Sequence, residues 1–291
     1  MRRTTPRICA TAALALLLSG CAFSPVPTAL ASSVSSAVPS APAGATGAVP
    51  SREPSVDLNA ALVSALQRAA GDSSLSAAVF DTKSGVTAVG GNRSYDTASI
   101  VKVDILATLL MQAQDAGRRL TARETAYATA MIEHSDNDSA TALWNAIGGA
   151  AGLDAAGKRF GLTATKGGAG GEWGLTQTTA QDQLMLLKAV FGTDSPLSAD
   201  SRGYLRGLMG QVQADQQWGV SAAGSNCALK NGWLPRSSTS LWDINSIGRV
   251  TADGRTYLIA VLSDGHATRA AGIAKVEDAA RAAVRTLAGS G

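Results

Sequence analysis

The chain has 291 residues and a formal net charge of +3, and no lysine or arginine cluster in it is interleaved with aromatic residues. Nucleic acid is therefore disfavoured as a partner, because proteins that bind it concentrate basic residues in patches. The two histidines are too few for an ordinary zinc hydrolase centre and disfavour a Ser-His-Asp triad. We expect no metal and no other cofactor.

The first residues have the pattern of a bacterial secretion signal. Arg2, Arg3 and Arg7 precede an apolar run over residues 10–18, which is too short to span a bilayer as a mature helix. Residues 18–21 resemble a lipobox, which implies cleavage before Cys21 and a lipid anchor on its thiol. The alternative is an ordinary signal peptide with another cleavage site. We expect a lipoprotein-type signal at 1–20 and a protein that is anchored to the membrane or secreted.

Residues 21–55 are a mixture dominated by Ala, Ser and Pro, without helical or alternating periodicity. Such a segment cannot bury a core, and we expect it to act as a tether that holds a domain at 56–291 away from the membrane. Cys9 would leave with the signal and Cys21 would carry lipid, so only Cys227 remains. The sequence therefore predicts no intrachain disulfide.

Hydrophobic periodicity in the domain favours an α+β fold. An antiparallel sheet would be built from both ends of the chain, with the terminal helices on one face and an all-helical insert on the other. The expected elements are helix 56–69, strands 75–80 and 86–89, helices between 99 and 210 that include 181–191 and 201–209, strands 228–233, 238–250 and 257–262, and helix 273–287.

The first chemically informative motif is Ser99-Ile-Val-Lys102, at the start of a segment too apolar for a surface helix. Residues i and i+3 share one helix face, so the Lys102 amine can reach the Ser99 hydroxyl. A desolvated lysine has a lowered pKa and can activate a serine as a nucleophile. The alternative makes Ser99 a helix N-cap and Lys102 a surface residue.

The second motif is Ser135-Asp136-Asn137, in a corner between two predicted helices. The Ser135 hydroxyl can relay a proton to a leaving nitrogen, and the Asn137 amide can hold a substrate amide through both donor and acceptor. The alternative is a turn that only caps the next helix.

The third motif, Lys230-Asn231-Gly232, ends a short strand. A lysine there can bind a carboxylate, the glycine permits close backbone approach, and the Trp233 N–H is placed as an oxyanion donor. The alternative is an ordinary Asn-Gly turn.

Together the motifs resemble the signature of the serine β-lactamases and penicillin-binding proteins, most nearly the class A β-lactamases. The resemblance extends over about 56–287 and implies that family's three-layer fold. It implies Ser99 as nucleophile, Lys102 as general base and Ser135 as proton shuttle. Substrate contacts would come from Asn137, Lys230, Asn231, Gly232 and Trp233, with the Ser99 and Trp233 amides as oxyanion hole.

Two departures from the family pattern affect substrate and turnover. Asn231 stands where the family usually has Thr or Ser, which changes recognition of a substrate carboxylate. The loop that normally carries the deacylating glutamate is short and rich in glycine, and offers only Glu172. Glu172 is either that base or an exposed loop carboxylate.

The sequence thus predicts a secreted serine hydrolase that forms an acyl-enzyme at Ser99 and hydrolyses β-lactams or related amides. One alternative is a penicillin-binding protein, DD-peptidase or esterase with slow deacylation. Another is a non-catalytic lipoprotein that binds cell-wall fragments or antibiotics. The expected partners are a β-lactam or peptidoglycan-like small molecule and, through the anchor, the membrane. Nothing demands more than a monomer.

Overall fold

The computed structural model describes residues 56–289. The expected signal at 1–20, the tether at 21–55 and the lipidation site Cys21 lie outside the described residues. Within the described part, no helix combines the length and apolar character needed to cross a membrane.

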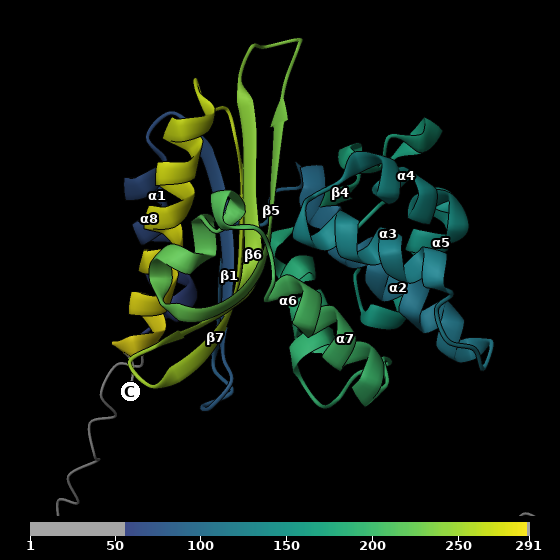
Figure 1. The fold of residues 1–291 in the computed structure, drawn as a ribbon. Coiled ribbons are helices and arrows are strands. Elements are labelled where there is room, and N and C mark those ends of the chain that lie inside the picture. Colours follow the sequence, from purple (N-terminus) through teal and green to yellow (C-terminus); the bar gives the residue numbers. More distant parts are fainter. Residues whose placement is uncertain (1–55, 290–291) are drawn as a thin grey trace, which may run out of the picture. The chain divides into compact units, whose positions relative to one another are not determined.

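A five-stranded antiparallel sheet forms the centre of this part of the chain (Figure 1). Strands from the N-terminal end lie beside strands from the C-terminal end, and Ala78 pairs with Ala260. The spatial order is β2 (Thr87–Gly90), β1 (Ser74–Asp81), β7 (Arg255–Asp264), β6 (Trp242–Ala252) and β5 (Ser225–Pro235). This arrangement confirms the predicted α+β fold with a sheet from both chain ends.

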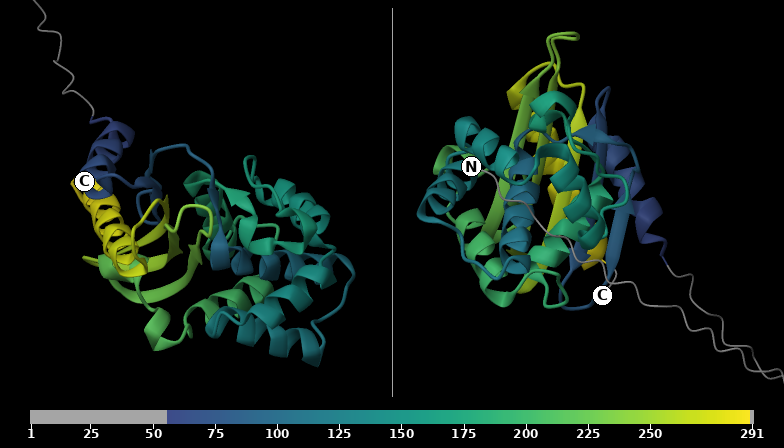
Figure 2. Two further views of the ribbon diagram at one scale, coloured as in Figure 1. Left: turned by 90° about the horizontal axis from the view of Figure 1, so that it is seen from above. Right: turned by 90° about the vertical axis from the view of Figure 1, so that its right-hand side faces the viewer.

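Helices cover both faces of the sheet. The terminal helices α1 (Leu58–Ala70) and α8 (Arg269–Ala288) lie on one face, and the helical insert lies on the other, as Figure 2 shows from above. Residues 257–262 in the middle of β7 are all buried, because a strand covered on both faces has no solvent side. The continuous apolar run in this strand follows from that position.

The helical insert surrounds one helix, α2 (Val101–Asp115), which is buried on nearly all sides. This burial confirms the central helix predicted from its apolar circumference. The helices around it are α3 (Ala122–Glu133), α4 (Asn137–Ala146), α5 (Gly149–Phe160), α6 (Ala180–Phe191) and α7 (Ala199–Met209).

The predicted elements all occur, but two of them begin four residues away from the predicted start. The last helix was expected from 273 and begins at Arg269, after Thr268 caps it. Residues 238–241 were expected to begin a strand, whereas β6 begins at Trp242. A turn occupies this stretch, since the Arg236 N–H donates to the Leu241 carbonyl at 2.8 Å and Ser240 has a left-handed φ of 58°. Asp253 and Gly254 form the tight turn between β6 and β7, as predicted, with φ values of 49° and 72°.

A two-stranded ribbon connects the sheet to the insert. It pairs β3 (Tyr95–Asp96) with β4 (Gln177–Thr178), and the 3-10 helix η1 (Ala98–Ile100) follows β3 directly. The fully buried Asn245 of β6 holds this crossing: its amide donates to the carbonyls of Asp96 and Thr97 at 2.8 and 3.0 Å, and its oxygen accepts from the Ser263 N–H at 3.0 Å.

Replacing Asn245 with alanine should therefore lower the free energy of unfolding by about 3 kcal/mol or more, because it leaves three buried backbone groups without partners at about 1–3 kcal/mol each. Urea denaturation followed by circular dichroism measures the change. Asn145→Ala, on the exposed side of α4, is the control and should shift the midpoint little. An equally small shift for Asn245→Ala would contradict this account of the crossing.

Candidate active site

The first motif lies where η1 runs into α2. Ser99 belongs to the 3-10 helix, and neither η1 nor α2 has a side-chain cap, so the Ser99 hydroxyl is not used as an N-cap. Ala98, just before it, has a left-handed φ of 47°, which is uncommon for a residue with a side chain and recurs at functional sites as well as in turns. Lys102 is fully buried, which excludes a surface role for it.

The amine of Lys102 is bound to the second motif. Its Nζ donates to the Ser135 carbonyl at 2.6 Å, to Asn137 Oδ1 at 2.8 Å and to Ser135 Oγ at 3.1 Å. None of its hydrogen bonds within residues 56–289 goes to Ser99. Three donated bonds match the three hydrogens of an ammonium, so this geometry accommodates the protonated form of the lysine.

Burial also decides how easily Lys102 loses that proton. Burial lowers its pKa from 10.5 to about 7, and the carboxylate of Asp136 partly opposes this shift. Near neutral pH the ammonium and the free amine are therefore present in comparable amounts. Loss of one proton gives Nζ a lone pair one helical turn from the Ser99 hydroxyl, as a general base requires.

The Ser135-Asp136-Asn137 corner is both a cap and part of the site. The Asp136 side chain accepts from the Ser139 N–H at 2.7 Å and caps α4, which agrees with the turn interpretation of this motif. Ser135 has a left-handed φ of 57°, and its hydroxyl and carbonyl both receive hydrogen bonds from Lys102. The turn capped by Asp136 thus places Ser135 and Asn137 where both contact the amine of Lys102.

Lys230, from the edge strand β5, completes this cluster. Its Nζ donates to Ser135 Oγ at 3.0 Å and to the Asn231 carbonyl at 3.0 Å, and the side chain is fully buried. Burial, and to a lesser extent the charge on Lys102, lowers the pKa of Lys230 well below its usual value. Because Ser135 Oγ accepts from both lysines, its own hydrogen is free to be donated to a third group.

The third motif divides its residues between two sides of β5. Side chains alternate along a strand, and Asn231 points away from Lys230. Its amide donates to the carbonyls of Gln216 and Trp218 at 2.7 and 2.9 Å, and the side chain is fully buried. The structure therefore gives Asn231 a fold-stabilising contact and does not bring its side chain to the other motif residues.

Gly232 lies against the backbone of the nucleophile. A Cβ added there would be 2.7 Å from the Ser99 nitrogen and 2.8 Å from the Thr97 carbonyl, too close for any side chain. The next residue, Trp233, directs its indole toward Arg269 at the start of α8, whose guanidinium lies 4.4 Å from the ring centroid. The backbone that leads into Trp233 thus lies against Ser99 at Gly232, while the indole of Trp233 packs against Arg269.

A cavity of about 350 Å³ opens beside these groups. Motif residues in its wall are Ser99, Asn137, Glu172 and Trp233. Glu172 is exposed, and its carboxylate makes no hydrogen bond within the described residues. The remaining lining residues, which sequence reasoning did not find, are Ala98, Thr141, Gly171, Trp173, Gly174, Leu175 and Leu234.

The sequence position of some of these lining residues could have indicated that they belong to the site. Thr141 is four residues after Asn137 and therefore shares its helix face. Trp173 is adjacent to Glu172. The Trp173 ring also lies against Lys102 of α2, with its centroid 4.9 Å from Nζ. This contact joins two distant segments of the chain and leaves no sequence pattern.

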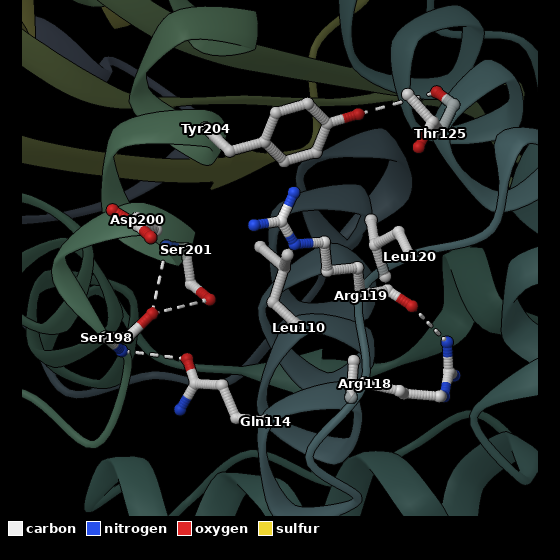
Figure 3. Close-up of a pocket in the computed structure, with 11 residues that line it drawn as sticks. Leu110, Gln114, Arg118, Arg119, Leu120, Thr125, Ser198, Asp200, Ser201 and Tyr204 are labelled. Carbon is white, nitrogen blue, oxygen red and sulfur yellow. Dashed lines mark hydrogen bonds between the residues drawn. The ribbon is translucent and has the colours of Figure 1, made fainter.

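A larger cavity, about 500 Å³, lies elsewhere in the insert, between α2, the start of α3 and α7 (Figure 3). Leu110, Arg119 and Tyr204 are among its lining residues, and none of the residues of the three motifs lines it. Its size alone does not make it a site. In the part of the chain that the structure describes, no group of His, Cys, Asp and Glu side chains forms a metal-binding arrangement.

The comparisons with known proteins agree with this geometry. A model of the β-lactamase enzyme family matches residues 110–287, more than half of the chain. The chain belongs to the β-lactamase enzyme family. The matched segment contains Ser135 and Lys230 but begins after Ser99 and Lys102, so the first motif stands on the structure and on its own sequence.

A curated relative and several solved structures extend the family match. "Putative lipoprotein LppW" of Mycobacterium tuberculosis is 25% identical over 224 residues, which are 74% of this chain and 71% of that protein.

Two of the solved structures illustrate the fold. The extended-spectrum β-lactamase TLA-1 has a TM-score of 0.70 at 16% identity and covers 79% of this chain and 99% of its own. The protein PBP-A, solved as a mutant in an acyl-enzyme complex with penicillin G, has a TM-score of 0.66 at 20% identity over 80% and 96% of the two chains. At these identities the structures show the shared fold of the serine β-lactamase and penicillin-binding protein superfamily.

Gly232→Ala tests the close approach of β5 to Ser99. The added methyl group would push β5 away from the nucleophile and misplace the backbone donors, and we expect covalent modification of Ser99 to slow by about 10²–10³-fold. The rate of adduct formation with a penicillin measures the loss. Gly207→Ala in α7 is the control, because no atom lies within 4 Å of the place its methyl group would take, and it should react at the parental rate. Equal rates for both variants would count against the close approach.

Proposed function

We propose that the protein is a serine hydrolase that forms an acyl-enzyme at Ser99 with β-lactams or related amides. One observation carries this proposal: two fully buried lysines, Lys102 and Lys230, both donate to Ser135 Oγ beside the cavity that contains Ser99. Burying two lysines is unfavourable, and a protein that only binds a ligand has no need of this arrangement.

The proposed acylation uses each group in turn. Neutral Lys102 takes the Ser99 proton as Ser99 Oγ attacks the substrate carbonyl, and the backbone N–H groups of Ser99 and Trp233 stabilise the oxyanion. Ser135 then donates its free proton to the leaving nitrogen and is reprotonated through Lys102. Asn137 holds the substrate amide, and Lys230 supplies positive charge for a substrate carboxylate.

The acyl-enzyme can either be hydrolysed rapidly or persist, and one observation favours each outcome. Glu172 lines the cavity and is the candidate base for the deacylating water, which would make the protein a β-lactamase. Its carboxylate has no hydrogen bond within residues 56–289, which favours the slow deacylation of a penicillin-binding protein, DD-peptidase or esterase. The acyl-enzyme that PBP-A forms with penicillin G supports the shared first step.

The location belongs to the proposal as well. The lipobox-like residues at 18–21 and the name of the mycobacterial relative support a lipid-anchored protein outside the cytoplasm, with Cys21 as the modified residue. We propose that it acts there as a monomer on β-lactams or peptidoglycan-like molecules.

Intact-protein mass spectrometry with penicillin G tests the nucleophile. The wild-type protein should gain the mass of one ring-opened penicillin, and Ser99→Ala should gain none, because Ser99 is the serine that lines the cavity. Release of the adduct would identify hydrolysis, and persistence would identify slow deacylation. Absence of an adduct on the wild type, or an adduct on Ser99→Ala, would refute the proposal.

The rate of acylation should depend on pH through Lys102. Because burial lowers the pKa of Lys102 to about 7, the amine is protonated and inactive below that pH, so the rate should rise with pH and level off above about 7. Lys102→Ala should slow acylation by about 10²–10⁴-fold and abolish that rise. Adduct formation measured from about pH 5 to about pH 9 decides this; undiminished acylation by the variant would show that Lys102 is not the base.

A further inference from the structure

Trp173 occupies the side of the site where the loop meets the buried lysine. It begins the short 3-10 helix η3 (Trp173–Leu175), is half-buried and lines the Ser99 cavity. Its ring centroid lies 4.9 Å from Lys102 Nζ, and its indole N–H donates to Thr141 Oγ1 of α4 at 3.1 Å. The indole therefore covers a face of Lys102 that Ser135 and Asn137 leave open.

The loop that carries Trp173 is held at several points. The backbones of Lys166 and Gln177 exchange hydrogen bonds of 2.8 and 2.9 Å, which close its base. Inside it, the fully buried Thr176 accepts from the Gly168 N–H at 3.1 Å through its side chain and from the Thr97 N–H at 2.9 Å through its carbonyl. Because Thr97 is two residues before Ser99, the loop and the nucleophile share one framework, and the indole is a fixed wall.

Hydrolysis of an acyl-enzyme needs a water molecule at this wall. The water oxygen bonds to the acyl carbon as the bond from that carbon to Ser99 Oγ breaks; one water proton passes through a base to Ser99 Oγ, and the product leaves as a carboxylic acid. Lys102 and Glu172 are the bases near Ser99. An aromatic face provides no strong acceptor for such a water, and the indole stands between the loop and Lys102.

We propose that Trp173 excludes the deacylating water and thereby sets the lifetime of the acyl-enzyme at Ser99. This inference rests on the proposed acylation of Ser99. It concerns the step that follows, deacylation, whose rate Trp173 would limit by keeping water away from the acyl-enzyme. Trp173 thus slows the hydrolysis step, in which a water molecule and a base act on the acyl-enzyme. A purely structural role for the indole would affect stability but not the ratio of the two rates.

The test compares adduct formation and adduct loss in the full chain with penicillin G. After excess penicillin is removed, intact mass gives the lifetime of the adduct. We expect a persistent adduct on the wild type and, for Trp173→Ala, an adduct lifetime shortened by about tenfold or more. Because the indole also contacts Lys102, the formation rate is measured in the same variant, and the rate of adduct loss should rise by about tenfold or more relative to it. Trp173→Phe, which keeps an aromatic face, should stay close to the wild type.

Tyr127→Ala is the matched control, because Tyr127 also lies against a cation, Arg123 at 5.3 Å, but does not line the Ser99 cavity. Its adduct lifetime should equal that of the wild type. If Trp173→Ala does not fold, Thr141→Val replaces it: this variant removes the acceptor of the indole N–H, and should also shorten the lifetime.

Two results would overturn the inference while leaving acylation intact: a wild-type adduct that clears rapidly, or an unchanged lifetime when the indole is removed or released. A wild type that forms no adduct at all would instead overturn the proposed function, and this inference with it.

Discussion

The site depends on placing two lysine amines around one serine oxygen in a water-poor environment. Lys102 and Lys230 are both fully buried and both donate to Ser135 Oγ, at 3.1 and 3.0 Å. Burial lowers the pKa of both amines, and the charge on Lys102 lowers the pKa of Lys230 further. The Asp136 carboxylate and the carbonyls of Ser135 and Asn231 partly offset this cost. The reactivity of the cluster is therefore a product of burial.

The fold supplies that burial by bringing three separate elements to one point. Lys102 comes from a helix enclosed by other helices, Ser135 from a strained corner fixed by the cap of α4, and Lys230 from the edge of the sheet. Asn245 and Gly232 then fix the crossing between sheet and insert, the first by hydrogen bonds and the second by having no side chain. Neither residue touches the buried amines, yet both determine where Ser99 lies.

Sequence reasoning succeeded where a residue type and a local period carry the information. The strands at 75–80 and 257–262 were predicted from apolar alternation and runs. The motifs also singled out the two lysines and Ser135, which the structure brings into contact, while their catalytic roles stay predictions. Alternation along β5 also predicts that Asn231 points away from Lys230, but the motif interpretation treated the three residues as one contact set.

The contacts that sequence reasoning missed are formed between distant segments. The Asn231 amide donates to the carbonyls of Gln216 and Trp218. No sequence pattern near residue 231 predicts these hydrogen bonds. The start of β6 was misplaced because a turn at 236–241 with a left-handed Ser240 has a polar sequence that is also compatible with a strand. Such features follow from tertiary packing, which overrides local propensity.

Acylation and deacylation, the two steps of the proposed reaction, use residues in different environments. The acylation residues include buried side chains, and the deacylation residues lie in a loop. Acylation depends on Lys102 of α2 and Lys230 of β5, which are fully buried, so a change of either side chain disturbs a buried contact. Glu172 and Trp173 belong to a short glycine-containing loop whose framework is held by its ends and by Thr176, and neither of the two side chains is fully buried. A family that keeps the first set and varies the second retains acylation while the lifetime of the acyl-enzyme changes. The substitution of a single loop side chain is then enough to separate an enzyme that turns over from one that stays acylated.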